Sequence, residues 1–519
     1  MNADRLMAHF ERISDAPDAV SKLRRFILDL AVRGKLVDQD PGDEPAEALL
    51  ERIASKKGEL SSRSRTKTTH ENEKGPYELP PSWIWSRIAD LGLLSPRNNA
   101  SDSAVCSFDP MSLISAAFGV GAAHEKRPWG DIKKGYTHIA DGDVAVAKIT
   151  PCFENGKSTV FRSLTGGIGA GTTELHVVRP IEMSPDYIVL FLKSPCFIEN
   201  GIPRMTGTAG QKRLPGDYFA YRPFPLPPLA EQHRIIAKVD ELMMLCDRLE
   251  ASQAERDSRR DRLVVASLNR LSQPTDSDEF KKDAGFTLSH LNRLSTKPEH
   301  IKELRKAILN LAVRGKLVPQ DDAWQTAPLS AIAEQIVDCP HSTPKWQPRG
   351  KICVRTNQFS PGKLDLTLSR FVSETTFRER IQRLAPQAND ILYSREGGIL
   401  GVACRVPEGV ELCLGQRMML IRPGQKADSA YLELVLNSPL ITEIAKKSTT
   451  GGAAPRVNVS TVKAYPIPLP PLAEQKRIVA KVDELMGICD KLETQLESQQ
   501  KGRRQLLEAL LHEALEGVG

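Results

Sequence analysis

The sequence lacks several features that mark common classes of protein. It contains no apolar run near 18 residues, which argues against a membrane-spanning helix. Its nine cysteines are scattered and form no C-x-x-C pair, which argues against a disulfide framework and against a zinc site. The first residues, MNADRLMAHFERI, have no signal-peptide core. These absences predict a protein of the reducing cytoplasm without a metal site.

Catalytic motifs are also missing. The sequence contains no G-x-x-x-x-G-K-[ST], no H-E-x-x-H, no G-x-S-x-G and no methyltransferase tetrapeptide of the Asn/Asp-Pro-Pro-aromatic type. The glycine-rich run GGIGAG at 166–171 lies between strand-like stretches and opens no helix, so it is interpreted as a turn. No catalytic residue is predicted, although an active site can also form from residues distant in the sequence.

The most prominent feature that is present is a duplicated segment. Residues 225–250 read PLPPLAEQHRIIAKVDELMMLCDRLE and residues 468–493 read PLPPLAEQKRIVAKVDELMGICDKLE, with 21 of 26 positions identical. The proline pair suits the first turn of a helix, and Glu231 in that turn complements the helix dipole. Because no Pro or Gly follows before Pro274, the first copy predicts a helix of about 40 residues, roughly 60 Å long.

Apolar residues recur at every third or fourth position of this segment, which is typical of an amphipathic helix. The stripes comprise Leu229, Ile235, Val239, Leu242 and Cys246 in the first copy and Leu472, Ile478, Val482, Leu485 and Cys489 in the second. One such stripe alone is ordinary core packing. Two copies favour a pseudo-symmetric molecule in which the stripes pack against each other or contact partner subunits.

A second duplicated block stands at the front of each half. Residues 7–37 match residues 288–318, and LAVRGKLV is identical in both. Each copy predicts a helix that ends at a left-handed glycine, Gly34 or Gly315. Each half therefore has one helix at its front and a longer helix at its back.

Each half also contains a domain outside these repeats. Short strands punctuated by Gly and Pro predict a mixed α/β module in both, and NDILYSR at 389–395 parallels DGDVAVAK at 141–148. The second domain contains 18 Lys and Arg against 12 Asp and Glu, and the first contains 15 against 13. Related scaffolds with different polar side chains are expected if each domain binds a different ligand. The net charge of +6 permits nucleic-acid binding.

The predicted fold is α+β, with two globular α/β domains separated by long antiparallel, coiled-coil-like helices in a pseudo-twofold repeat. Residues 271–300 are interpreted as a polar linker, and the basic segment 61–74 as a solvated loop or as a flexible arm on a phosphate backbone. The predicted parts are an N-terminal helical scaffold and linker at 1–78, a first domain at 79–224, a central helical scaffold at 225–325, a second domain at 326–467 and a final long helix at 468–519.

PLPPLAEQ at the start of a long helix after each of two variable domains resembles the specificity subunit of type I restriction–modification systems (HsdS). The AVRGKLV block, TGGAAPRVNVSTVKAYPIPLPPLAEQ at 450–475 and GDVAVAKITPCFENGKST at 142–159 resemble the same family, the last of these its target recognition domain. The resemblance covers nearly the whole chain. Residues 1–75 form a longer lead-in than some members have.

This resemblance implies a subunit that is not an enzyme alone and has no cofactor of its own. Each domain would read one half of a split, asymmetric target in double-stranded DNA, and the helices would set the spacer. The partners implied are two modification subunits, which bind S-adenosylmethionine and methylate adenine, and two restriction subunits, which use ATP and Mg²⁺ to translocate and cleave DNA.

Residues that contact DNA are expected among Arg, Lys, Asn, Gln, Ser and Thr, which bind bases and phosphates. The candidates are Lys148, Thr150, Lys157, Thr172, Gln211, Lys212 and Arg213 in the first domain and Arg355, Asn357, Ser394, Arg395, Gln416, Arg417 and Arg456 in the second. Each could instead be a solvated charge or a structural hydrogen-bonding group. Two other functions stay open, namely a coiled-coil adaptor that joins two protein-binding domains, and a nucleic-acid enzyme with an unrecognised site.

Overall fold

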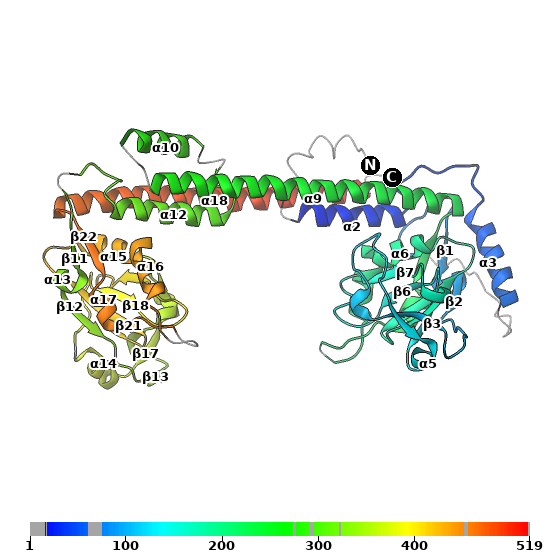
Figure 1. The fold of residues 1–519 in the computed structure, drawn as a ribbon, viewed down its shortest axis with the longest axis horizontal. Helices are drawn as coiled ribbons and strands as arrows, with labels where there is room; N and C mark the ends of the chain where they lie inside the picture. Colours follow the sequence, from blue (N-terminus) through cyan, green and yellow to red (C-terminus); the bar gives the residue numbers. More distant parts are fainter. Residues whose placement is uncertain are drawn as a thin grey trace. The chain divides into compact units, whose positions relative to one another are not determined.

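The computed structural model describes residues 16, 18–60, 75–208, 210–272, 277–290, 294–320, 323–450 and 455–516. The chain divides into two compact units, each with one sheet-rich domain attached to helices (Figure 1). The first unit comprises Met1–Glu255 and Gln500–Gly519, and the second comprises Arg256–Gln499. Each unit therefore contains the first part of one long helix and the last part of the other, as an antiparallel repeat requires.

Among the residues that the structure describes, four helices contribute to the helical part of the first unit. They are α2 (Ala19–Val32), α3 (Ala46–Leu60), the first part of α9 (Leu229–Ser272) and the last part of α18 (Leu472–Glu516). The expected long helix is confirmed, since α9 has 44 residues and α18 has 45. Helix α2 ends as predicted, with Gly34 at φ 66°, and Gly315 has the same φ after α12 (Pro298–Val313).

The first domain contains two four-stranded sheets and a two-stranded pair. One sheet is antiparallel, in the order β2 (Gly92–Leu94), β9 (Leu175–Pro180), β6 (Val144–Ala147) and β7 (Ser158–Val160). The other, in the order β4 (Glu125–Pro128), β3 (Val105–Asp109), β8 (Ile168–Gly171) and β5 (Thr137–Ala140), contains a parallel β3–β8 pair. Strands β1 (Ile84–Arg87) and β10 (Pro223–Leu226) pair separately. The helices are α4 (Ile88–Leu91), α5 (Trp129–Ile132), α6 (Pro185–Lys193), α7 (Pro195–Gly201) and α8 (Gly216–Tyr221).

The second unit has the same plan. Its scaffold contains α10 (Ser277–Ser289), α12 (Pro298–Val313), the last part of α9 and the first part of α18. Its antiparallel sheet has the order β12 (Ala333–Asp338), β21 (Met418–Pro423), β18 (Ile391–Ser394) and β19 (Ala403–Arg405). A second sheet has the order β13 (Trp346–Gln347), β17 (Arg370–Val372), β14 (Lys351–Val354) and β20 (Leu412–Leu414). The strand pairs are β11 (Gln325–Pro328) with β22 (Pro466–Leu469) and β15 (Phe359–Ser360) with β16 (Lys363–Leu364), and the helices are α13 (Leu329–Ile332), α14 (Glu374–Ile381), α15 (Ser429–Asn437), α16 (Pro439–Lys447) and α17 (Val459–Lys463).

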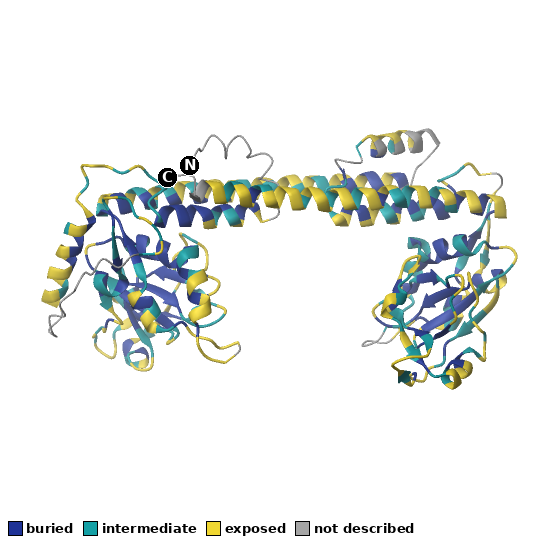
Figure 2. Ribbon diagram, turned by 180° about the vertical axis from the view of Figure 1, so that it is seen from behind, coloured by how far each residue is buried: buried dark blue, intermediate teal, exposed yellow. Residues whose placement is uncertain are grey.

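Equivalent contacts show that the two domains are related. In the first, Arg179 at the end of β9 donates to both oxygens of buried Asp143, at 2.7 and 2.8 Å. In the second, Arg422 at the end of β21 donates to both oxygens of buried Asp390, at 3.0 and 2.7 Å. The parallel that the sequence suggested between the domains is therefore confirmed. The central strands β6 and β18 are buried along their whole length (Figure 2).

The glutamate of each PLPPLAEQ segment attaches its domain to a long helix. Trp83 Nε1 donates to Glu231 Oε2 at 2.9 Å, and Trp324 Nε1 donates to Glu474 Oε1 at 3.1 Å. Both carboxylates are buried, and burial raises the pKa of Glu231. The glutamate therefore does more than complement the helix dipole, because it also holds a tryptophan from the start of the domain.

The glutamine that follows makes a second attachment. Gln232 Oε1 accepts from Ser184 N at 3.0 Å, and its Nε2 donates to Pro227 O at 3.0 Å. Gln475 accepts from Asp428 N at 2.8 Å in the same way. Each duplicated segment therefore joins the start of its long helix to the residue before α6 in the first domain or before α15 in the second.

Replacing Gln232 by alanine is expected to lower the free energy of unfolding by about 2–4 kcal/mol, since it leaves a buried amide and a buried carbonyl without partners. Urea denaturation of the full chain measures this loss. The matched control is His233→Ala, at the exposed next position of α9. Equal stability of the two variants would show that the glutamine bonds contribute little.

The long helices pack differently from the sequence expectation. The stripe of α9 that contains Ile235 and Val239 belongs to one apolar cluster with Leu23 and Ile27 of α2 and with the domain core. Its charged edge is also duplicated: Arg24 contacts Asp247 and Glu250 on α9, and the equivalent Arg305 contacts Asp490 and Glu493 on α18. The prediction that the two stripes pack mainly against each other was therefore wrong, because each stripe packs on the front helix of its own half.

The end of the other long helix adds a smaller apolar cluster to each unit. Leu507 of α18 packs with Ala16 and Ala19 in the first unit. Val264 and Leu268 of α9 pack with residues of α12 in the second unit. Leu472 is 45 % exposed and takes no part in this packing, unlike the other stripe residues.

Two further expectations need correction. Residues 271–300 are not simply a linker, because they contain α10. The run GGIGAG is not simply a turn, because its last four residues form β8. A Cβ on Gly169 would lie 2.4 Å from the carbonyl oxygen of Ser107, so the close approach of β3 and β8 requires glycine there.

Candidate nucleic-acid interface

Each domain presents a loop that is closed by backbone hydrogen bonds next to an arginine. In the first domain, Thr206 and Arg213 exchange N–H to carbonyl bonds of 3.0 and 2.8 Å. In the second domain, Thr450 and Arg456 exchange two bonds of 3.0 Å. These two segments, closed by Thr206 and Arg213 and by Thr450 and Arg456, are here called the arginine loops. The segment 61–74 and Gly451–Ala454 lie outside the described residues.

The same backbone ladder fixes both arginine loops to a sheet. In the first domain, Thr150 N donates to Lys212 O at 3.0 Å, and Leu214 N donates to Lys148 O at 2.7 Å. In the second domain, Gly397 N donates to Pro455 O at 2.9 Å, and Val457 N donates to Arg395 O at 2.9 Å. Segments about 60 residues apart are thereby brought together, and each loop lies at the end of a central strand, β6 or β18.

Most of the first-domain candidates meet at this place. Gln211, Lys212 and Arg213 are exposed, and Lys148 and Thr150 lie beside them, half-buried. Lys157 is on the same hairpin as Lys148, but its Nζ donates to the carbonyl of Met111 at 2.9 Å. Thr172 stands two residues before Glu174, whose N–H donates to its hydroxyl at 3.3 Å, and Glu174 in turn binds Arg213.

The sequence analysis missed Glu174, an acidic residue at the centre of this cluster. Arg213 donates from Nε and Nη2 to the two carboxylate oxygens, at 2.9 and 2.8 Å. The hydrogen bonds from Arg213 hold the pKa of Glu174 below its ordinary value. The candidates were Arg, Lys, Asn, Gln, Ser and Thr, so a carboxylate that orients one of them lay outside the expected side chains.

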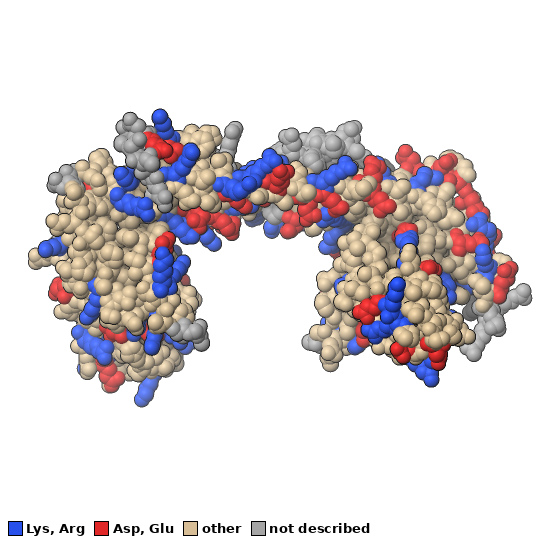
Figure 3. Space-filling view, viewed as in Figure 1, with Lys and Arg blue, Asp and Glu red and all other residues tan. Residues whose placement is uncertain are grey.

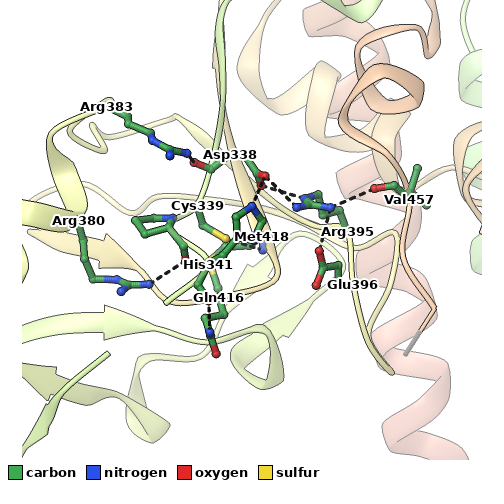
Figure 4. A network of polar contacts seen from close by, with 11 residues as sticks. Asp338, Cys339, His341, Arg380, Arg383, Arg395, Glu396, Gln416, Met418 and Val457 are labelled. Atoms are coloured by element: carbon green, nitrogen blue, oxygen red, sulfur yellow. Dashed lines mark hydrogen bonds and ion pairs between the residues drawn. The ribbon is translucent and has the colours of Figure 1, made fainter. Parts of the chain in front are cut away.

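In the second domain, a buried ion-pair network contacts Val457, the residue after Arg456 (Figure 4). Arg395 is only 7 % exposed, and it donates to both oxygens of Asp338 at 2.9 and 2.8 Å and contacts Glu396 at 2.9 Å. Ser394 is fully buried. We therefore correct the expectation for these two residues, because burial keeps both side chains from the surface that DNA would contact. Arg395 instead donates to the carbonyl of Val457 at 3.3 Å.

A second buried arginine arranges the neighbouring surface. Arg380 donates to the carbonyls of Leu414 and Gly415 at 2.6 and 2.9 Å, and to the carbonyl of Ser342 at 3.2 Å. The side chain of Gln416 donates to the carbonyl of His341, which agrees with a structural role for this glutamine (Figure 4). Arg380 therefore joins the segment before β21 to the segment after β12.

The remaining second-domain candidates lie on the surface around this network. Arg417 and Arg456 are exposed. Arg355 lies beside Gly415, since a Cβ there would be 3.7 Å from its Cγ, and its guanidinium is 6.0 Å from the ring of Trp346. Asn357 is exposed just after β14. Basic side chains are spread over the visible face of this domain, with fewer acidic ones between them (Figure 3).

The described residues contain no group of three or more His, Cys, Asp or Glu side chains that could hold a metal ion. Within the same residues, no helix is long and apolar enough to cross a membrane. The chemistry that the arginine loops offer is hydrogen bonding and charge, which are the interactions that bind phosphates and base edges.

Comparisons with known proteins identify one family. Residues 345–500 match the family model described as type I restriction modification DNA specificity domain. The chain is 35 % identical to the type I restriction enzyme EcoEI specificity subunit of Escherichia coli, over 96 % of this chain and 94 % of that protein. It is 33 % identical to the EcoAI specificity subunit of Escherichia coli, with the same coverage of 96 % and 94 %.

A solved structure has the same fold. A chain from the work titled "Structural basis underlying complex assembly and conformational transition of the type I R-M system" superposes with a TM-score of 0.53 at 20 % identity, over 85 % of this chain and 99 % of that one. The expected α+β architecture is confirmed by this likeness. Given the identity of 35 % over nearly the full length of a curated relative, the chain belongs to the family of type I restriction–modification DNA specificity subunits.

Proposed function

We propose that each domain reads one half of a bipartite, asymmetric DNA target through the surface around its arginine loop. The observation that carries this proposal is the duplicated ladder: two domains hold an arginine in the same backbone position while the surrounding side chains differ. The shared backbone ladder would place both loops against the duplex in the same way, and the different side chains would contact different bases.

Arginine and its neighbours in these loops match the chemistry of DNA. Arginine donates two hydrogen bonds to guanine, glutamine binds adenine, and lysine binds phosphates. Gln211, Lys212 and Arg213 of the first loop offer all three types within three exposed positions. In the second domain, Arg355, Arg417 and Arg456 serve the same purposes, and Asn357 is a candidate for adenine.

The helices serve assembly in this proposal. The stripe residues hold each long helix against the front helix of its half, and the exposed faces of α9 and α18 are available to partners. We expect two modification subunits, which bind S-adenosylmethionine and methylate adenine, and two restriction subunits, which use ATP and Mg²⁺. This chain supplies recognition and carries no catalytic residue of its own, so the purified chain alone should neither methylate nor cleave DNA.

Exchanging residues 79–224 for the first domain of another specificity subunit is expected to change one half of the methylated sequence and to leave the other half and the spacer unaltered. Single-molecule sequencing of host DNA, with the chain and its genomic neighbours coexpressed, maps the methylated adenines. The matched control exchanges residues 326–467 and should change only the other half. A motif that survives both exchanges, or the lack of any bipartite motif, would favour a scaffold without a DNA role.

A further inference from the structure

The residue just before β9 in the first domain, Glu174, and the residue just before β21 in the second, Arg417, occupy equivalent positions but are opposite in charge. Lys148 N donates to Glu174 O at 2.9 Å in the first domain, and Arg395 N donates to Arg417 O at 3.1 Å in the second. Strands β9 and β21 begin one residue later, at Leu175 and Met418. Position 174 of the first domain therefore corresponds to position 417 of the second.

In the first domain, Glu174 forms an ion pair with Arg213 of the arginine loop. The carboxylate of Glu174 occupies the Nε–Nη2 edge of Arg213 through bonds of 2.9 and 2.8 Å. Arg213 Nη1 also donates to the carbonyl of Gln211 at 3.4 Å. A guanidinium has five N–H groups, so Nη1 and Nη2 each keep one N–H that can donate to the O6 and N7 of a guanine. An arginine fixed on one edge by a carboxylate is held in one orientation, which favours reading a base.

In the second domain the same position adds a cation. Arg417 is exposed and adopts φ 71°, and its Nη1 would be 3.5 Å from a Cβ on Gly397. The N–H of Gly397 donates to the carbonyl of Pro455, the residue before Arg456. Glu396, which pairs with Arg456 in the backbone ladder, places its carboxylate on Arg395 at 2.9 Å. Among the described residues, no carboxylate forms an ion pair with Arg417 or Arg456.

We propose that this pair of equivalent positions determines how each domain holds DNA. Glu174 is a positioning residue that directs Arg213 to a base in the first half of the target. Arg417 acts together with Arg456 to bind phosphates beside the second half. The inference rests on the proposed contact of the arginine loops with DNA. It assigns a different role to the position in each domain: Glu174 orients an arginine, and Arg417 adds a positive charge.

The proposal predicts opposite salt effects for the two reversals of charge. Each phosphate contact contributes about 0.9 to the slope of log affinity against log salt concentration. Glu174→Arg should steepen this slope by roughly one to two contacts, and Arg417→Glu should reduce it by a similar amount. The double exchange E174R/R417E keeps the net charge and should leave the slope near that of the unchanged chain.

Base discrimination separates orientation from charge. Glu174→Gln releases Arg213, so the preference for the target over a duplex with a scrambled first half should fall roughly tenfold. Preference over a duplex with a scrambled second half should not change. Arg417→Gln should weaken binding to all duplexes by a similar factor, since phosphates carry no sequence information.

The experiment measures fluorescence anisotropy of the full chain, copurified with its modification subunits, on the mapped target and on the two scrambled duplexes at several salt concentrations. Two variants with matched charge changes serve as controls. Glu182→Gln removes a carboxylate bound to Arg52 and Lys56 on α3, and Arg378→Glu reverses a charge on α14. Calorimetry checks that every variant is folded.

Equal slopes for Glu174→Arg, Arg417→Glu and the controls would overturn the inference while leaving the proposed function intact. The same holds if Glu174→Gln keeps full discrimination of the first half. If the unchanged complex does not distinguish the target from either scrambled duplex, the proposed function itself fails. This result comes from the unchanged complex alone, so it is distinct from a failure of the inference.

Discussion

Replacing Val239 by glutamate is expected to destabilise the first unit by about 4 kcal/mol or more, because the change places an unpaired carboxylate in a closed apolar cluster. Val239 is fully buried on α9, and its cluster contains Leu23 and Ile27 of α2 as well as the core of the first domain. Calorimetry of the full chain should show the transition of this unit lowered by roughly 10 °C. The equivalent change Val482→Glu should act on the second unit.

The control for this prediction lies on the same helix. Met244 is 54 % exposed, so Met244→Glu introduces the same charge on α9 without burying it. Its transition should stay within about 2 °C of the unchanged chain. If both variants melt alike, the duplicated stripe does not stabilise the unit and the scaffold is held together by other contacts.

Replacing Asp109 by asparagine is expected to stabilise the first domain, increasingly so as the pH rises. Asp109 ends β3 with a fully buried side chain, and among the described residues neither of its carboxylate oxygens has a hydrogen-bond partner. Burial raises the pKa of this carboxyl to about 7. The charged form therefore costs free energy that the neutral amide of asparagine avoids.

The direction with pH follows from proton binding. In the unfolded chain the carboxyl loses its proton near pH 4, whereas the folded domain retains it up to about pH 7. The folded state binds more protons between these values, so the stability of the unchanged chain falls across this window. Asp109→Asn should match it near pH 4 and exceed it by about 4 kcal/mol at pH 8.

Urea denaturation at pH 4, 6 and 8 measures this difference. Asp131→Asn, at an exposed position of α5, is the matched control and should show no such trend. A constant difference between pH 4 and 8 would mean that Asp109 has an unperturbed carboxyl, and would contradict the effect of burial.

The sequence predicted the architecture because the fold repeats long, regular elements. Helices α2, α9, α12 and α18 follow from apolar spacing and from glycine at fixed places, which are local properties. The prediction of a turn at β8 was wrong because its glycines allow the close approach of β3. This requirement becomes visible only in the structure, where Gly169 lies against the carbonyl of Ser107. Leu472 was misjudged because helical spacing does not tell whether a partner reaches the first turn.

The site was only partly predictable for a similar reason. Lys212, Arg213 and Arg456 were chosen because cationic side chains bind bases and phosphates, and they are exposed, but their contact with DNA stays a prediction. Arg395 was misassigned because its partner Asp338 lies 57 positions away in the sequence. Glu174 was missed because its expected role depends on Arg213, which lies 39 positions away in the sequence.

The division of the long helices between the units has a consequence for how the chain is made. The first unit is completed by Leu507 and its neighbours, which pack on Ala16 and Ala19. During synthesis these partners are separated by almost the whole chain, so the first domain leaves the ribosome long before its scaffold is complete. Contacts between such distant residues form slowly. A stop codon shortly before Leu507 would therefore leave Ala16 and Ala19 without the leucine that packs on them.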